Sequence, residues 1–337
     1  MSQKSKLKLP HLGSLGPGLL FAATSVGTSH LVQSTRAGAL YGLSLVGIVV
    51  AANAIKYPAF RIASDYFPAT GTSLLEAYRR QGRWALAAYF LITMSTLLFA
   101  VSALALMSAG LVKVIVPLPI TTEWLALGLI VATAALIVIG HYKALENAIK
   151  VLVIMMVVCT LIATATVLPE VRWQSALAVT PANIDVTTLV FIAALVGWMP
   201  VPLDVSVWQS LWAKAKYQDS RKKPDAADCR FDFNLGFMST LFLALCFLCL
   251  GAGLMHSEGI APLSGSTAFS AQLISLYQSV FGSGLGPLVG IAALAVIYSS
   301  LLAVMDGFPR ALASLHRRWQ GIPEAQDDYC LTETSPF

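Results

Sequence analysis

The sequence has 337 residues, of which 57% are hydrophobic and only 12% are charged, and its mean hydropathy is +0.73. Soluble domains carry about 25% charged residues and about 45–50% apolar ones, so this composition excludes an ordinary soluble enzyme, a disordered chain and a nucleic-acid-binding protein. The apolar excess predicts an integral membrane protein whose main partner is the lipid bilayer. In a membrane protein, the basic residues behind the formal net charge of +5 indicate which loops face the cytoplasm, and they do not indicate a nucleic-acid-binding surface.

The chain divides into a short tail, a series of apolar segments and a second tail. Residues 1–14 carry three lysines but no cleavage site after an apolar stretch, so we interpret them as a cytoplasmic tail rather than a signal peptide. A spanning helix needs about 20 apolar residues. The predicted spans are 15–36, 41–63, 84–113, 123–140, 146–168, 187–212, 233–255 and 284–308. Residues 15–318 thus form one transmembrane domain, and residues 319–337 form a polar C-terminal tail.

The segments between the spans carry the charges and two amphipathic stretches. A polar stretch surrounds residues 76–83, and residues 268–281 repeat apolar side chains at helical spacing, which is typical of an interfacial helix. With the N-terminus inside, 19 of the 22 Lys and Arg residues fall on the cytoplasmic side, Lys56 among them. Basic residues accumulate in cytoplasmic loops. We therefore predict eight spans in the plasma or inner membrane, with both termini cytoplasmic.

Two of the predicted spans are interrupted at mid-membrane. The first contains the polar run Thr24–His30, and the sixth contains Gly197–Asp204 with two prolines. Proline lacks an N–H and clashes with the carbonyl four residues back, so the carbonyls of Val196 and Trp198 should be free. Such a break survives only where it is buried in protein or lines a watery cavity. Broken spans at the start of two successive blocks are typical of inverted-repeat secondary transporters.

Four motifs give the chain a family resemblance. They are Gly16–Gly18 at the start of the first span, Tyr41–Leu45 at the second, Leu145–Lys150 at the fifth and Met305–Phe308 at the end of the eighth. Together they resemble the NRAMP family of proton-coupled divalent-metal transporters, over nearly the whole chain. The resemblance implies an all-α LeuT-type inverted repeat with the first and sixth spans at its centre. Only three spans belong to the second repeat, which we therefore expect to be incomplete.

The motifs that hold the metal in that family are changed here. The Asp-Pro-Gly-Asn motif of the first span falls on Gly27–His30, so its Asp is missing. The Met-Pro-His motif of the sixth span falls on Val201–Leu203, and the small residue before it becomes Trp198. The soft ligands of the family are therefore absent from their aligned positions.

The polar residues of the two breaks are the candidate site. A carboxylate at mid-membrane is usually functional, so Asp204 is the first candidate metal ligand, unless the span is shifted and Asp204 lies at the cytoplasmic mouth. His30 is a candidate second ligand or proton-linked gate, although a lone His is often a packing residue. The hydroxyls of Thr28 and Ser29 and the carbonyls of Val196 and Trp198 complete the set. Oxygen ligands without a thioether suit Mg²⁺, Ca²⁺ or Mn²⁺.

The sequence therefore predicts a secondary transporter that moves a divalent cation by alternating access, with protons as a candidate coupling ion. Two alternatives remain: a transporter of the same fold for a non-metal substrate, and a non-transporting membrane sensor or binding protein. No catalytic constellation is present in the sequence, so we expect no enzymatic activity and no resident cofactor.

Overall fold

The computed structural model describes residues 17–139, 143–171, 173, 185–220, 225–282, 284 and 286–324, and the predicted N-terminal tail lies outside them. All regular elements in these residues are helical. The elements of the first half are α1 (Pro17–Ser25), the π-helical η2 (Val26–Ser34), α2 (Thr35–Tyr41), α3 (Val46–Thr70), α4 (Leu74–Gln81), α5 (Arg83–Ile115), α6 (Thr122–Ile139), α7 (Lys143–Val167) and η3 (Leu168–Glu170). Those of the second half are α8 (Val186–Trp198), η5 (Leu203–Val205), α9 (Ser206–Ser220), α10 (Ala226–Gly251), η6 (Ala252–His256), α11 (Ser266–Phe281) and α12 (Gly286–Trp319).

Each predicted span has a helical counterpart, and the chain is an all-α integral membrane protein. Within the described residues, six stretches are long and apolar enough to cross a membrane. They are Val46–Thr70, Arg83–Ile115, Thr122–Ile139, Val186–Gln218, Ala226–His256 and Pro287–Trp319. The first predicted span is divided among α1, η2 and α2. The fifth corresponds to α7, whose second half forms with η3 the shorter apolar stretch Ile154–Glu170. The amphipathic stretches form α4 and α11.

Two helices are longer than the hydropathy predicts. α3 ends at Thr70, where Gly71 adopts the left-handed conformation that terminates helices, and α12 ends at Trp319, well beyond the predicted residue 308. Hydropathy marks only the apolar length of a helix. The polar ends of α3 and α12 continue as helix because they pack against other elements.

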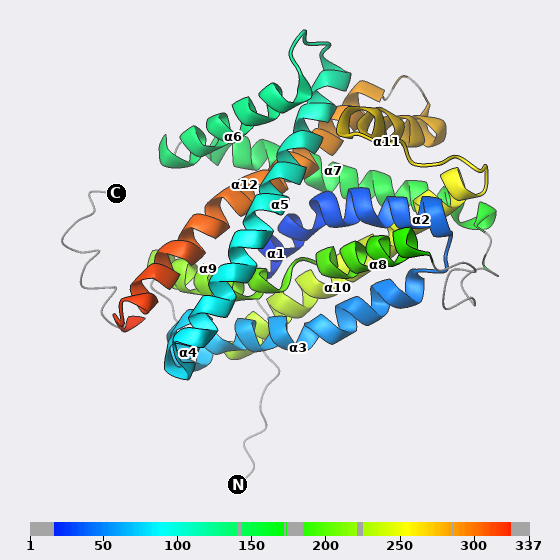
Figure 1. Ribbon diagram of the computed structural model, residues 1–337. Helices are drawn as coiled ribbons and strands as arrows, with labels where there is room; N and C mark the ends of the chain where they lie inside the picture. Colours follow the sequence, from blue (N-terminus) through cyan, green and yellow to red (C-terminus); the bar gives the residue numbers. More distant parts are fainter. Residues whose placement is uncertain are drawn as a thin grey trace.

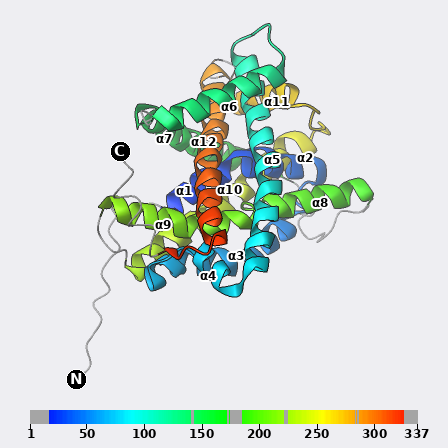
Figure 2. The ribbon, with the colours of Figure 1, turned by 60° about the vertical axis from the view of Figure 1, so that its left-hand side comes forward.

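The helices form two packing groups that meet at the interrupted spans. In one group, α1, η2 and α2 lie against α10, which also packs on α3, while α3 contacts α8 and α9. In the other, α5 packs against α6, α11 and α12. Figure 1 shows α5 and α12 side by side across the molecule, and Figure 2 shows α8 and α9 extending from their break in opposite directions. η2 contacts both α5 and α12, so the first break lies where the groups meet.

Close approach at glycines fixes the first span on α10. A Cβ on Gly236 would collide with the carbonyl oxygen of Gly18, and one on Gly251 would collide with that of Thr35. Small residues allow membrane helices to approach at the backbone, where packing supplies the attraction that water would otherwise provide. The buried Asp232 carboxylate also accepts a hydrogen bond from the Gly18 amide at 2.7 Å. The two ends of the first span are thereby held against one helix.

Candidate functional site

The first break forms at the predicted polar run. Gly27 has φ −63° and ψ −115°, outside the helical region, and the chain continues as the π-helix η2. π-Helical turns are rare and often occur at functional sites. A Cβ on Gly27 would collide with the Ser300 side chain of α12, so glycine is needed here for close packing. The Thr28 hydroxyl is buried and makes no hydrogen bond.

The second break also forms where the prolines predict it. α8 ends at Trp198, residues 199–202 are irregular, and the short turn η5 leads into α9 at Ser206. Asp204 lies in η5 and is 4% exposed. The sequence therefore located both interruptions: the first by its polar run inside an apolar segment, and the second by its prolines, which cannot supply the N–H that a continuous helix requires.

A lysine that the sequence analysis placed among the cytoplasmic basic residues occupies the second break. Lys56 of α3 is 7% exposed, and its Nζ donates to the carbonyl oxygens of Val196 at 2.7 Å, Gly197 at 2.8 Å and Val201 at 3.1 Å. The assignment of Lys56 to a cytoplasmic surface is therefore wrong. The Val196 carbonyl is free of helical bonding, as expected, but the lysine already occupies it. The signal was present in the sequence, since a lysine inside the apolar segment 41–63 is an intramembrane ionisable residue.

Asp204 is the buried carboxylate of the second break. Neither of its carboxylate oxygens makes a hydrogen bond of ordinary geometry, while its backbone carbonyl accepts from the Tyr89 hydroxyl at 3.4 Å. The side chain interacts electrostatically with Lys56 and with the Thr96 hydroxyl of α5. A direct ion pair between Lys56 and Asp204 does not form. The alternative position at an open cytoplasmic mouth is inconsistent with this burial.

A small cavity lies between the two breaks. Its volume is about 30 Å³, enough for a water molecule or a largely dehydrated ion. Thr24, Thr28 and Ser29 line it from the first span, Trp198 and Val201 from the sixth, and the remaining lining residues are Thr96, Ala100, Leu104, Pro202, Val205, Val304 and Phe308. Thr96 therefore borders the cavity and also interacts with Asp204. The tertiary structure brings Thr28, Ser29 and Trp198 together around this cavity, while Asp204 is not among its lining residues.

His30 does not join this group. Its Nδ1 lies 2.5 Å from the Ser25 carbonyl oxygen and 2.7 Å from the Ser29 hydroxyl, and its Nε2 lies 2.8 Å from the Thr240 carbonyl oxygen of α10. Both ring nitrogens are therefore engaged with the protein, and the imidazole connects the first span to α10. In the part of the chain that the structure describes, no cluster of three or more His, Cys, Asp or Glu side chains is arranged to hold a metal ion.

The thioether of Met199, in the second break, also points elsewhere. Met199 is fully buried, and its sulfur lies 4.0 Å from the Ser34 hydroxyl at the end of η2. It does not line the cavity between the breaks.

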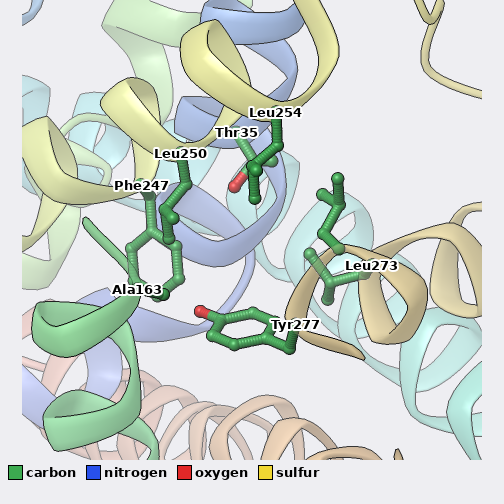
Figure 3. A pocket seen from close by; sticks show the side chains of 8 residues that line it. Thr35, Ala163, Phe247, Leu250, Leu254, Leu273 and Tyr277 are labelled. Carbon is green, nitrogen blue, oxygen red and sulfur yellow. The ribbon is translucent and has the colours of Figure 1, made fainter. Parts of the chain in front are cut away.

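Another cavity lies between α2, α7, α10 and α11 (Figure 3), and it lacks the features of a binding site. Its volume is only about 10 Å³, and its walls are mostly apolar side chains such as Phe247, Leu250 and Leu273. The Tyr277 hydroxyl at its edge pairs with Thr160 at 2.8 Å. The Thr35 hydroxyl also lines it and is buried without a hydrogen-bond partner, but a cavity of about 10 Å³ is at the lower limit for one water molecule and too small for a larger ligand.

Both the sequence and the fold of this chain are similar to those of known proteins. The model of the Natural resistance-associated macrophage protein-like (Nramp) family matches residues 18–313. The uncharacterized protein PM0681 of Pasteurella multocida (strain Pm70) is 32% identical over 324 residues, which cover 94% of this chain and 73% of that protein. The crystal structure of the Eremococcus coleocola manganese transporter matches with a TM-score of 0.61 at 16% identity, covering 98% of this chain and 74% of that one.

Proposed function

Because the chain belongs to the Nramp family, we propose that it is a secondary transporter that moves a divalent metal ion across the membrane by alternating access. The observation that carries this proposal is the cavity between the two broken spans, where four hydroxyl side chains (Thr24, Thr28, Ser29 and Thr96) stand among mostly apolar lining residues, and which both packing groups border. Transporters of this architecture bind their cargo at such breaks, where helix ends and unwound backbone provide polar groups at membrane depth.

We assign the cargo to the hydroxyl-lined side of the breaks. The Thr28 hydroxyl is buried without a partner, and a buried polar group of this kind costs free energy unless a ligand or water satisfies it. The Ser29 hydroxyl adds a second oxygen ligand and the Trp198 carbonyl a third. Asp204, which interacts with Thr96 at the edge of the cavity, supplies a negative charge that attracts the cation. Oxygen ligands favour hard ions, so Mg²⁺, Ca²⁺ and Mn²⁺ are the expected cargo class. His30 acts in this proposal as a positioning residue and not as a ligand.

The proposal includes orientation and coupling. Both termini are cytoplasmic and the membrane is the plasma or inner membrane, since the basic residues outside the spans remain strongly biased to one side. Proton movement accompanies the cargo, with His30 and Asp204 as the candidate buried titratable groups near the breaks.

Flux measurements test the transport proposal. The full chain in proteoliposomes with an inside-negative potential should take up Mn²⁺, followed by an internal metal-sensitive dye, and an internal pH dye reports accompanying protons. Thr28→Val keeps the side-chain shape but removes the hydroxyl, and it should slow uptake. Ser239→Ala is the matched control, because that hydroxyl is exposed and donates only to the Leu235 carbonyl. Equal uptake in empty and protein-containing vesicles, for every divalent ion tested, would contradict the proposal.

A non-metal cargo is the second candidate. Two observations favour it: the ammonium of Lys56 holds carbonyls that a cation could otherwise use, and the described residues offer no three-ligand acidic or histidine cluster. The proteoliposome experiment separates the two candidates, because a non-metal transporter would show no uptake of any divalent ion.

A further inference from the structure

The ammonium group of Lys56 is fully coordinated inside the protein. A lysine ammonium has three N–H donors, and here each faces one carbonyl oxygen, at 2.7, 2.8 and 3.1 Å. A neutral amine would direct its lone pair at one of these oxygens, so the arrangement requires the charged form. The three acceptors come from the C-terminal turn of α8 and from the irregular stretch after it. Three converging carbonyls around one charge form a cation site.

The electrostatics of the break also favour a cation at this point. The C-terminal end of a helix carries partial negative charge, and α8 ends here because of the proline break. The buried Asp204 carboxylate, whose oxygens make no hydrogen bond of ordinary geometry, also interacts electrostatically with Lys56. Backbone carbonyls and a half-helix end are the groups with which broken membrane helices hold an inorganic cation.

We propose that Lys56 is a tethered cation: its ammonium permanently occupies a cation site formed by the carbonyls of Val196, Gly197 and Val201, and it excludes free cations from that site. The site would otherwise accept a small cation by oxygen coordination. This inference goes beyond the proposed function, because it holds whether the cargo is a metal ion or not.

The tethered cation has a structural consequence for the transport site. Lys56 belongs to α3, and its bonds reach both the end of α8 and Val201 in the irregular stretch after it, so one charge joins α3 to the helix end and to the break itself. The cargo is then left with the hydroxyl-lined side, at Thr28 and Ser29. A lysine that only stabilised the end of α8 would make the same three hydrogen bonds. The test must therefore show whether the three carbonyls also bind a free cation.

Chemical rescue provides that test. Lys56→Ala in the purified full chain removes the ammonium and its stem, and its thermal unfolding midpoint should fall below that of the wild type. n-Propylammonium, which replaces the missing atoms, should restore most of the midpoint. Tetramethylammonium at the same concentration carries the same charge without an N–H and should not. At least one of the small metal cations Na⁺, K⁺ and Mg²⁺, each added as its chloride, should also raise the thermal unfolding midpoint of this variant.

Two comparisons control the experiment. The wild type and Lys113→Ala, which loses a lysine at the far end of α5, should respond to none of these cations beyond their general salt effect. If Lys56→Ala does not fold, Lys56→Gln keeps two N–H donors without the charge, and the same cations should stabilise it. A folded variant that no cation stabilises would overturn the tethered-cation assignment. Metal uptake by the wild type is measured separately, so loss of uptake alone contradicts only the proposed function.

Discussion

At the scale of single residues, the charges buried at the second break define the site. Lys56 and Asp204 bring opposite charges into the membrane interior without a direct ion pair. An isolated charge at this depth is costly, and two opposite charges in one low-dielectric region offset part of that cost. All three N–H donors of Lys56 are used by backbone carbonyls, while the Asp204 carboxylate oxygens remain able to accept hydrogen bonds or contact a cation. Asp204 is therefore the group of the two that can respond to an arriving cation.

Replacement of Asp204 by Asn should reduce divalent-ion uptake while the protein stays folded. The change removes the negative charge beside the cavity, and interactions with a charged group contribute about 1.5–3 kcal/mol, so uptake should fall roughly tenfold to a hundredfold. Initial rates in proteoliposomes measure the effect. Asp306→Asn is the control, because Asp306 pairs with Arg310 at 2.8 Å on the surface of α12. Loss of the folded protein together with uptake would instead indicate a structural role for Asp204.

Cation selectivity is a second prediction at this scale. Thioether and thiolate ligands select soft ions, and the Met199 sulfur lies near Ser34 and not in the cavity. We expect the protein to bind Cd²⁺ no more tightly than Mg²⁺ beyond the ordinary Irving–Williams trend. Isothermal titration with Mg²⁺, Mn²⁺ and Cd²⁺ measures this. Met199→Leu conserves the buried volume and should leave the three affinities unchanged. Selective Cd²⁺ binding that this substitution removes would show that Met199 is a ligand.

At the scale of elements, two contacts hold the broken spans in place. One is the backbone approach of the first span to α10. The other is a polar cluster in which Glu324, which follows the end of α12, accepts hydrogen bonds from the Ser73 amide at 2.8 Å and from Lys214 of α9 at 3.0 Å. Glu76 of α4 belongs to the same cluster; burial alone would raise its pKa, but the hydrogen bond from Arg79 and the charge of Arg318 hold the pKa below its ordinary value.

The contact between α10 and the first span at Gly251 should not accommodate a methyl group. A Cβ there would collide with the Thr35 carbonyl, which is backbone and cannot rotate away, so Gly251→Ala should destabilise the protein by about 1–3 kcal/mol or more. Gly47→Ala is the matched control in α3, because a Cβ there meets nothing within 4 Å, and it should be neutral or stabilising. Thermal unfolding in detergent compares the two. Equal midpoints would mean that the first span does not approach α10 this closely.

Removal of the Glu324 carboxylate should detach the segment after α12. Glu324→Ala removes the hydrogen bonds that the carboxylate accepts from the Ser73 amide and from Lys214, at an expected cost of about 2 kcal/mol. Limited proteolysis should then cleave the chain after Trp319 faster than in the wild type. Glu258→Ala, on an exposed turn, should change neither stability nor cleavage. Unchanged cleavage in the Glu324 variant would show that apolar contacts alone hold this segment.

At the scale of the whole molecule, the two packing groups provide the architecture for alternating access. The first and sixth spans belong to the group with α3 and α10, and the cavity lies between this group and α5 with α12. Relative movement of the groups would open the cavity toward one side of the membrane or the other. We expect the basic-residue bias to set which side of the membrane each loop faces, and labelling can test that orientation.

Cysteine labelling in intact cells tests the orientation. In a cysteine-free background, a cysteine at position 220 should be shielded from a membrane-impermeant thiol reagent added outside, because that loop is predicted to be cytoplasmic. Ile120→Cys, in the exposed turn between α5 and α6, should react. The reverse pattern would invert the assigned topology.

The sequence by itself determined the all-helical membrane class, the order of the helical segments, the position of both breaks and the family. These features depend on local chemistry: apolar length, the missing N–H of proline and short motifs. Only the tertiary structure showed that Lys56 occupies the carbonyls of a helix 140 residues away, that His30 bonds to α10, and that Glu324 returns to Ser73. A sequence pattern reports whether a residue prefers lipid or water, but the partner of a buried polar group is set by how distant segments pack. The candidate site was therefore predicted as a set of residues, and packing decided which of them face one another.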